Sequence, residues 1–223
     1  MVTDLVQECP PGSEWDGENV DLAVILVNTP SAGSHLDYTD LLTAIRTYLA
    51  HADFILVRST VDLDFLTHPV YRVFGNRIGF SPEFYGATKW SRRGVLDLGF
   101  SIYTPNVPEW FRDITATGDV MIAEPGEVIL AKLAENAFLA TKVTFFHELQ
   151  IAAAERGLDP EAVRKIVTAD PRIGAGHSHM EEPGWSSHCF DKDVPAYART
   201  AHSTLVDGAI LANRTNLLPR RNR

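Results

Sequence analysis

The sequence has few cysteines, no long apolar run and no excess of basic residues. It contains two cysteines, Cys9 and Cys189, in 223 residues. That is too few for a disulfide framework, so we expect a reducing, cytoplasmic location. No apolar stretch approaches the roughly 20 residues of a membrane-spanning helix, and the first residues lack the basic and apolar regions of a signal peptide. The net charge is −9 at pH 7, which argues against general affinity for nucleic acids or anionic membranes.

Almost continuous apolar segments predict the strands of a parallel sheet. They lie at residues 22–27, 53–57 and 77–80, and such runs are typical of strands covered on both faces. Apolar residues at helical spacing predict a helix over residues 38–50, and a short helix is expected from about Asp62. This order predicts a parallel α/β sheet with right-handed crossovers.

Polar side chains follow each of these three strands. They are Asn28-Thr29, Ser59-Thr60 and Glu83. Because ligands bind beyond the carboxyl ends of parallel strands, we expect these side chains to gather at one binding edge. The alternative is that they cap helices and form turns, which explains Ser and Thr better than Glu83.

One long helix is predicted over residues 126–156, which lack internal glycine and proline. Its apolar residues cover more than one stripe, so it has more apolar surface than one small sheet can cover, and we expect a homodimer through it. Lys132 and Asn136 share a face of this helix and could clamp an oxygen that develops negative charge. The alternative is that both are solvated.

The chain is expected to divide into two domains, residues 1–123 and 124–223. Further strands are expected at residues 98–102 and 119–122, with a short helix near Trp110 between them. The second domain is expected to be all helical. Its other predicted elements are an end to the long helix at Gly157, a helix from Asp159-Pro160 to about Ala169, a turn over residues 170–176 and a final helix over residues 194–213.

Cys189 lies in a predicted loop and is a candidate nucleophile. A lone thiol near the ammonium of Lys192 and near imidazoles is in a setting that favours thiolate, which can attack a carbonyl group. The alternative is an unreactive loop cysteine with solvated neighbours. A zinc site made of His177, His179, His188 and Cys189 is a further alternative, although surface histidines are commoner.

Six motifs follow one another from about residue 21 to residue 213. They are Val27-Asn28-Thr29-Pro30, Arg58-Ser59-Thr60-Val61, Ser81-Pro82-Glu83-Phe84, the segment 132–143, Asp170-Pro171-Arg172-Ile173-Gly174 and Cys189-Phe190-Asp191-Lys192-Asp193. In this order they resemble the nucleotide-sugar 6-dehydrogenases, which oxidise UDP-glucose or GDP-mannose to the uronic acid. The resemblance implies a partial Rossmann-like sheet followed by an all-helical central dimerisation domain with one long helix.

The resemblance implies a role for each matching residue. Cys189 is the nucleophile that forms a thiohemiacetal and then a thioester with the sugar carbon. Asp193 and Thr60 position the hydrolytic water, and Glu83 acts as an acid–base group. Lys132 and Asn136 stabilise the oxyanion. The residues implied to bind NAD are Thr29, Pro30, Ser59, Thr60 and Lys192. Those implied to bind the nucleotide sugar are Glu83, Phe84, Lys132, Asn136, Arg172 and Phe190.

The sequence also departs from the family pattern. It has no G-x-G-x-x-G turn for the NAD pyrophosphate, so the cofactor is expected to be held mainly at its nicotinamide half. The chain is expected to begin near the middle of the family's NAD-binding domain and to end near Asn213, before a second α/β domain. A partner chain that completes the site is therefore an expectation. Before Cys189, serines replace two glycines, and Asp191 replaces a proline.

These departures leave two further functions open. The first is a non-catalytic relative that keeps the fold and the dimer interface. The second is a thiol enzyme that acts on a smaller carbonyl or acyl substrate without redox chemistry.

Overall fold

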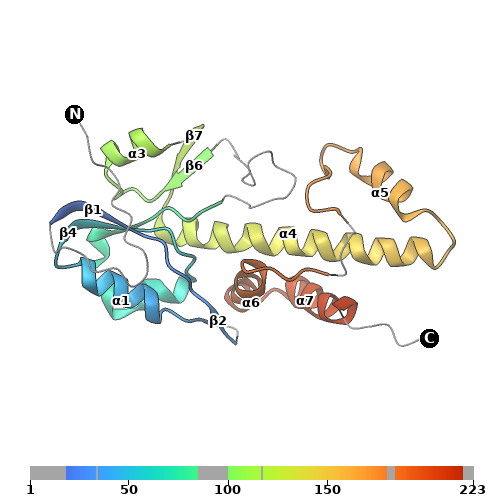
Figure 1. Ribbon diagram of the computed structural model, residues 1–223, viewed down its shortest axis with the longest axis horizontal. Coiled ribbons are helices and arrows are strands. Elements are labelled where there is room, and N and C mark those ends of the chain that lie inside the picture. The colour runs from blue at the N-terminus through green and yellow to red at the C-terminus, as the bar shows by residue number, and fades with distance from the viewer. Residues whose placement is uncertain (1–18, 34, 85–99, 117, 180–183, 218–223) are drawn as a thin grey trace.

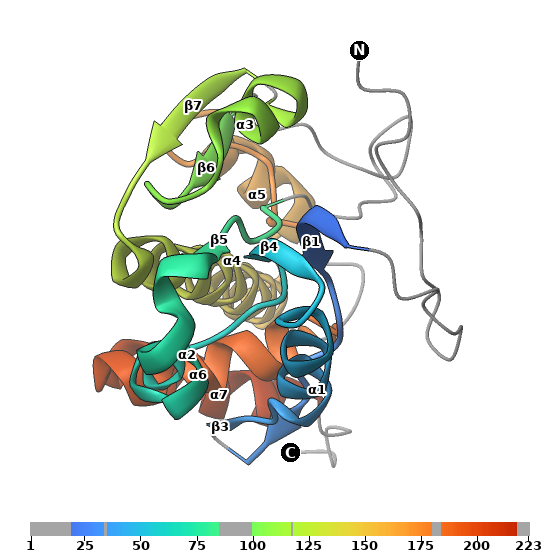
Figure 2. The same ribbon diagram turned by 90° about the vertical axis from the view of Figure 1, so that its left-hand side faces the viewer.

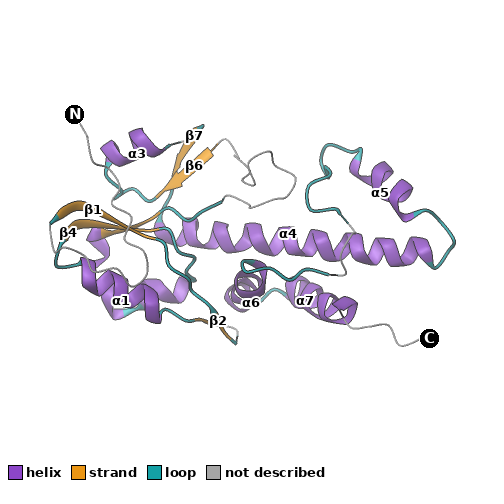
Figure 3. Cartoon of the chain, in the orientation of Figure 1, coloured by secondary structure: helices purple, strands orange, loops and turns teal. Residues whose placement is uncertain are grey.

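The computed structural model describes residues 19–33, 35–84, 100–116, 118–179 and 184–217 (Figure 1). Cys9 lies outside this part of the chain. All described strands lie at one end of the molecule, and the other end is built from helices along one long helix (Figure 3). Within the described residues, none of the helices combines the length and the apolar character needed to cross a membrane.

Three parallel strands form the main sheet. β1 (Val20–Ile25), β4 (Ala52–Val57) and β5 (Ile78–Phe80) lie in the order β1-β4-β5. The pairs Ile25↔Val57 and Val57↔Phe80 place the carboxyl ends of the strands level with one another. The prediction of a parallel α/β sheet is therefore confirmed. The connecting elements are the hairpin of β2 (Ser31–Ala32) and β3 (His35–Leu36), α1 (Thr39–Tyr48), the 3₁₀ turns η1 (Leu63–Thr67) and η2 (Gly75–Arg77), and α2 (Pro69–Phe74).

The first strand is not covered on both faces, contrary to the sequence-based prediction. Val24 is 46% exposed and Leu26 is 57% exposed, whereas Ile25 is buried against Leu41 and Ile45 of α1. Leu22, on the same face as Val24, is partly buried against the core that contains Phe54, so among the described residues this face of β1 is covered only near its start. β4, in the middle, matches the prediction, and its last three residues are fully buried.

A second, two-stranded parallel sheet adjoins the first. β6 (Phe100–Tyr103) and β7 (Asp119–Ile122) are joined by α3 (Glu109–Thr115), as predicted, although residues 98 and 99 lie outside the described part. Thr104 connects the two sheets, because its Oγ1 accepts a bond from Phe80 N at 2.9 Å and its N donates to Phe80 O at 3.0 Å. Gly79 permits this approach, since a Cβ there would lie 2.7 Å from Val107.

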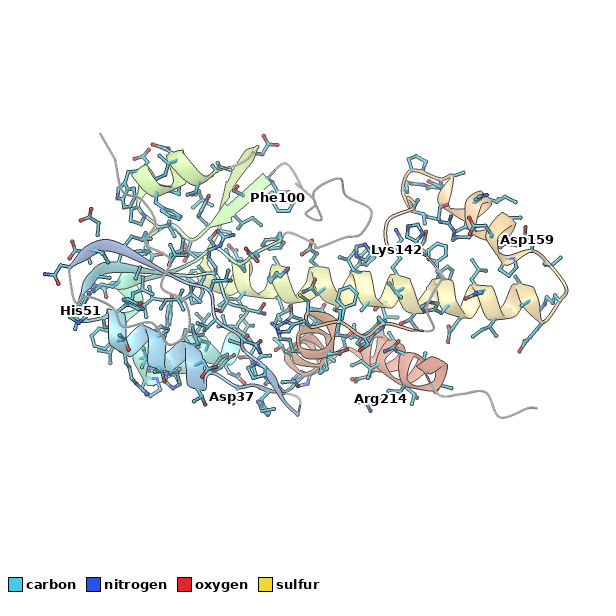
Figure 4. The ribbon with its side chains drawn as sticks, viewed as in Figure 1. Asp37, His51, Phe100, Lys142, Asp159 and Arg214 are labelled. Atoms are coloured by element: carbon cyan, nitrogen blue, oxygen red, sulfur yellow. The ribbon has the colours of Figure 1, made fainter. Side chains whose placement is uncertain are left out.

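The helical half is organised along α4 (Pro125–Ala154). Its start is fixed by a capping box between Glu124 and Glu127, and Gly157, at φ +66°, follows its end. α5 (Pro160–Thr168) is capped by Asp159, labelled in Figure 4, whose side chain accepts a bond from Glu161 N. α6 (Phe190–Ala201) and α7 (Thr204–Leu217) lie along the side of α4 opposite α5 in both views (Figures 1 and 2).

The single final helix that the sequence predicts is in fact two helices. His202, at φ +48°, ends α6, and α7 starts two residues later. α6 also begins at Phe190, four residues before the predicted start. Pro195 explains the misprediction, because proline is typical of a helix's first turn but here lies inside the helix.

Two apolar cores meet along α4. Val128 and Ile129, in its first turns, belong to the core beneath the sheet, which also contains Val57. Ala137 and Ala140 belong to the core shared with α6 and α7. The division at residue 123 remains a prediction, but α4 joins both halves. The residues between these two sets therefore lie where the sheet edge and the helical half meet.

Candidate active site

The ends of β1 and β4 are tied together by two of the predicted cofactor residues. Ser59 Oγ donates to Val27 O and accepts from Val27 N, both at 2.8 Å. Thr29 Oγ1 donates to Thr60 O at 2.8 Å, and Thr29 is 1% exposed. These hydroxyls thus bond to backbone across the gap where the strands separate. Their contacts build the binding edge, and their predicted contact with NAD stays a prediction.

A recess beside these strand ends brings Thr60 and Lys132 together, one from the sheet and one from α4. Its other lining residues are Ser59, Val61, Phe80, Pro82 and Ile129. The recess is shallow and has space for little more than one water-sized group. It marks the edge where the sheet meets α4 but does not enclose a ligand.

Lys132 is almost buried, at 8% exposure, although the sequence left a solvated lysine as the alternative. Its Nζ lies 4.9 Å from the centroid of the Phe84 ring and 3.4 Å from Glu135 Oε2. Burial raises the pKa of the Glu135 carboxyl, and the Lys132 ammonium opposes that shift. An aromatic face and a carboxylate thus hold one positive charge at the edge of the recess.

Glu83 is paired with a different cation, Arg58. Its Oε1 lies 3.8 Å from Arg58 Nη2, and the Glu83 side chain is 46% exposed. Arg58 and Phe84 line a second hollow on the other side of Pro82, together with Phe100. The predicted acid–base residue therefore lies next to the recess, and an arginine that follows β4 holds its carboxylate.

Asn136, Lys192 and Asp193 form a buried network between α4 and α6. Asn136 Nδ2 donates to Asp193 Oδ2 at 2.5 Å, and Lys192 Nζ donates to Asp193 Oδ1 at 2.7 Å. All three residues are less than a tenth exposed. Both carboxylate oxygens are paired, one with a positive charge, as a buried carboxylate requires. The structure therefore brings these three predicted site residues together.

Cys189 lies at the start of α6 and is exposed. Its carbonyl oxygen accepts a bond from Asp193 N at 2.9 Å, so the thiol and Asp193 are one helical turn apart on one face. Cys189 stays outside the helix, in the turn directly before Phe190, as the sequence predicts, and the early start of α6 makes it the cap residue of that helix. The N-terminus of a helix favours negative charge, which suits a position where an anionic intermediate forms.

The loop before Cys189 is anchored by residues that the sequence analysis missed. Trp185 Nε1 donates to Thr144 Oγ1 at 3.0 Å, and Gly184 N donates to His147 Nδ1 at 3.0 Å. Asn213 Oδ1 accepts from Trp185 N at 2.6 Å, and its Nδ2 donates to Trp185 O at 2.9 Å. No local signal marks these partners, because they lie 28 to 41 residues away in the chain.

The two serines that replace glycines form hydrogen bonds in this loop. Ser187 Oγ accepts a bond from Phe190 N at 3.0 Å and caps the first turn of α6. Ser186 Oγ donates to Asp191 Oδ2 at 3.2 Å, so the aspartate that replaces proline is also engaged. The left-handed backbone is kept at Gly184, at φ +74°. The substitutions therefore stabilise the helix start that carries Cys189.

Arg172 points to solvent, with its side chain 87% exposed and paired with Asp170 at 2.6 Å. Its turn is fastened to α4, because Lys142 (labelled in Figure 4) donates to Ile173 O and Gly174 O. The structure thus leaves Arg172 apart from the buried network.

Phe190 lies against Trp185 and His177, with ring centroids 6.0 and 6.2 Å away. Burial lowers the pKa of His177, and the nearby charges of Lys142 and His179 add to this. Over the described residues, no three His, Cys, Asp or Glu side chains are placed to hold a metal ion. The proposed zinc ligands His177, His179, His188 and Cys189 are therefore not gathered into a metal centre.

Comparison with known proteins gives matches over most of the chain. Residues 127–216 match the UDP-glucose/GDP-mannose dehydrogenase family, central domain. A UDP-glucose 6-dehydrogenase of Streptococcus pneumoniae is 27% identical over 201 residues, which cover 82% of this chain and 50% of the relative. One of Pseudomonas aeruginosa is 39% identical over 92 residues, 41% of this chain and 20% of the relative.

Two solved structures share the fold of this chain. A UDP-glucose dehydrogenase from Pyrobaculum islandicum superposes with a TM-score of 0.72 at 22% identity, covering 87% of this chain and 50% of that one. A UDP-D-ManNAc dehydrogenase from Pyrococcus horikoshii gives a TM-score of 0.71 at 20% identity, with the same coverage. The chain spans about half the length of the relatives that align with most of it.

Proposed function

Because the chain belongs to the UDP-glucose/GDP-mannose dehydrogenase family, we propose that it is an NAD-dependent nucleotide-sugar 6-dehydrogenase. The observation that carries this proposal is the network of Asn136, Asp193 and Lys192, one turn from an exposed Cys189. The substrate class is a UDP- or GDP-hexose, whose C6 alcohol becomes a carboxylate. The few cysteines favour a cytoplasmic setting.

Two oxidations at one carbon require a trap for the aldehyde, and Cys189 supplies it. The thiolate adds to the aldehyde carbon, and the resulting thiohemiacetal loses a hydride and a proton to give a thioester. Water then attacks the thioester, the C–S bond breaks, and the carboxylate and the thiol are released. Lys132 and Asn136 stabilise the oxyanions that form at the carbonyl oxygen in these steps.

The remaining site residues handle water and protons. Asp193 is held by Asn136 and Lys192, and with Thr60 it orients the water that hydrolyses the thioester. Glu83, beside Arg58, takes and returns protons at the recess. Phe84, Arg172 and Phe190 are proposed to contact the nucleotide sugar.

NAD, when bound, accepts the hydride in each oxidation. Its nicotinamide half is proposed to lie at the strand ends beside Ser59, Thr60 and Lys132, because ligands of parallel sheets bind beyond the carboxyl ends of the strands. Thr29 and Pro30 follow β1 at the same edge, and Lys192 lies on the helix that directly follows Cys189. The sequence has no Gly-rich turn for the pyrophosphate.

We also propose a homodimer through α4. Phe138 is 67% exposed and Phe145 is 55% exposed, seven residues apart on one face. Large apolar side chains in a row on a monomer's surface mark an interface.

One observation favours a second candidate, a relative that binds a nucleotide sugar without turnover. The hydroxyls of Thr29 and Ser59 and both oxygens of Asp193 are already bonded within the chain. A residue in such bonds must change partners before it serves a ligand or a water molecule.

The test is NAD reduction with a panel of UDP- and GDP-hexoses. Cys189→Ala should lower kcat by about 1,000-fold or more, as expected when a covalent nucleophile is removed. Cys9→Ser, which removes the other thiol, is the matched control and should keep full activity. Absence of reduced nicotinamide together with a thermal shift caused by the nucleotide sugar alone would favour the binding relative. Equal rates for Cys189→Ala and the parent chain would reject the covalent route.

A further inference from the structure

A buried carboxylate joins the sheet to the helical half. Asp62 lies two residues after Thr60, and its side chain is 2% exposed. Its Oδ1 accepts bonds from the Tyr38 hydroxyl at 2.7 Å and from Asp64 N at 3.0 Å, and its Oδ2 pairs with Arg199 Nη2 at 2.5 Å. A carboxylate this deeply buried is strongly unfavourable unless it is paired, so the buried charge of Asp62 depends on these bonds.

Arg199 reaches this carboxylate from α6, the helix that directly follows Cys189. Its Nη1 also pairs with Asp64 Oδ2, at 2.8 Å. One guanidinium therefore bridges two carboxylates of η1 and its cap. The planar fork of arginine can do this, whereas the single ammonium of lysine cannot hold both in the same geometry.

The other contacts of α6 run to other parts of the molecule, since the bond from Asn136 to Asp193 joins it to α4 and its apolar residues pack against α4 and β3. Val194 and Ala198 pack with Ala137 and Ala140 of α4, and Ala196 packs with Leu36. Contacts among small apolar side chains are not directional, so a helix can slide or rotate slightly against them. The bridge from Arg199 is directional, and it runs to the segment that follows β4.

We propose that Arg199 is a positioning residue for the thiol site. Through Asp62 and Asp64 it fixes α6, and with it Cys189, relative to Thr60 at the end of β4. It acts through the position of these elements and does not touch the reacting atoms. The effect on turnover rests on the proposed function, whereas the effect on the position of α6 does not.

Spin labels test the position of α6 without any substrate. In the full-length chain with Cys9→Ser, one label is placed on Cys189 and one on Arg46→Cys. Arg46 is exposed on α1, whose buried face shares a core with Val61. Double electron–electron resonance should give a narrow distance distribution, and Arg199→Met should broaden or shift it.

Three further variants make this test decisive. Arg199→Lys, which keeps the charge but not the fork, should recover only part of the narrow distribution. Arg164→Met removes a comparable ion pair with Glu161 on α5 and should leave the distribution unchanged. Asp64→Asn removes only the outer half of the bridge, so this milder variant replaces Arg199→Met in the distance measurement if Arg199→Met does not fold. A distribution identical to that of the parent in Arg199→Met, or in Asp64→Asn where Arg199→Met does not fold, overturns the proposal, with or without turnover.

Kinetics test the consequence for the proposed reaction. In a parent chain that reduces NAD, Arg199→Met should lower kcat by about tenfold or more, while KM for the nucleotide sugar stays within about twofold. Loss of packing alone would not separate the two constants in this way. An unchanged kcat beside a broadened distance distribution would reject the effect of Arg199 on turnover and leave the proposed function standing.

Discussion

Asn213 fixes the loop that carries the candidate nucleophile. It lies on α7, is 3% exposed, and pairs with both backbone groups of Trp185, at 2.6 and 2.9 Å. Buried backbone groups outside helices and sheets need such partners, because an unpaired one loses its bonds to water without replacement. Trp185 is thereby held four residues before Cys189, so the loop reaches the start of α6 from a fixed point.

Removing this amide should be costly. Asn213→Ala leaves a buried N–H and a buried C=O without partners, and we expect it to lower the free energy of unfolding by about 2–4 kcal/mol. Urea unfolding followed by far-UV circular dichroism measures the change. Thr215→Ala, on the exposed part of the same helix, is the control and should stay within about 0.5 kcal/mol of the parent. Equal effects of the two changes would contradict the anchoring role.

At the scale of elements, the break between α6 and α7 depends on one strained residue. His202 has φ +48° and ψ +44°, the left-handed conformation that side chains with a Cβ disfavour. The turn separates α6, which carries Lys192 and Asp193, from α7, which carries Asn213. Both helices can then pack against α4 in different directions, which a single straight helix could not do.

Glycine should therefore be better than histidine at this turn. His202→Gly removes the strain at an exposed side chain and should raise the free energy of unfolding by about 0.5–1 kcal/mol. His202→Ala keeps the Cβ and loses the polar side chain, so it should give no gain. Thermal unfolding of the two variants beside the parent measures both changes, and a less stable His202→Gly would show that the imidazole itself holds the turn.

Elements whose signals are local could be predicted from the sequence. The apolar run of β4, the cap at Asp159 and the glycine after α4 each act within a few residues, and each is where the sequence placed it. The start of α6 could not, because Pro195 is a local signal that packing overrides. β1 was also mispredicted, since burial of its second face depends on which elements pack over the sheet there and not on the strand's own residues.

Residues of the candidate site also divide into those that local sequence signals could place and those that they could not. Lys132 and Asn136 could be placed on one helical face from their spacing alone. The bonds from Asn136 to Asp193 and from Arg199 to Asp62 join residues 57 and 137 positions apart, so no sequence window contains both partners. Candidate residues could thus be proposed from the sequence, while the groups that hold them in place became visible only in the fold.

At the scale of the whole molecule, the candidate site lies at the junction of two cores. Ile129 belongs to the core beneath the sheet and Ala140 to the core of the helical half, with Lys132 and Asn136 between them on α4. A small rotation of one half against the other therefore changes the site directly. A second chain packed along α4 would stiffen this helix and limit such a rotation.

The exposed face of α4 predicts what should happen when dimerisation is blocked. Phe138 and Phe145 are 67% and 55% exposed, and a stable interface of at least about 1,000 Å² would need such large apolar side chains at its centre. Phe138→Asp combined with Phe145→Asp puts two charges on each copy of that face, so the dimer should dissociate to monomer in size-exclusion chromatography with light scattering. Val73→Asp, at 67% exposure on α2, is the matched control and should remain dimeric. A parent chain that is monomeric at high concentration, or a double variant that remains dimeric, would reject α4 as the interface.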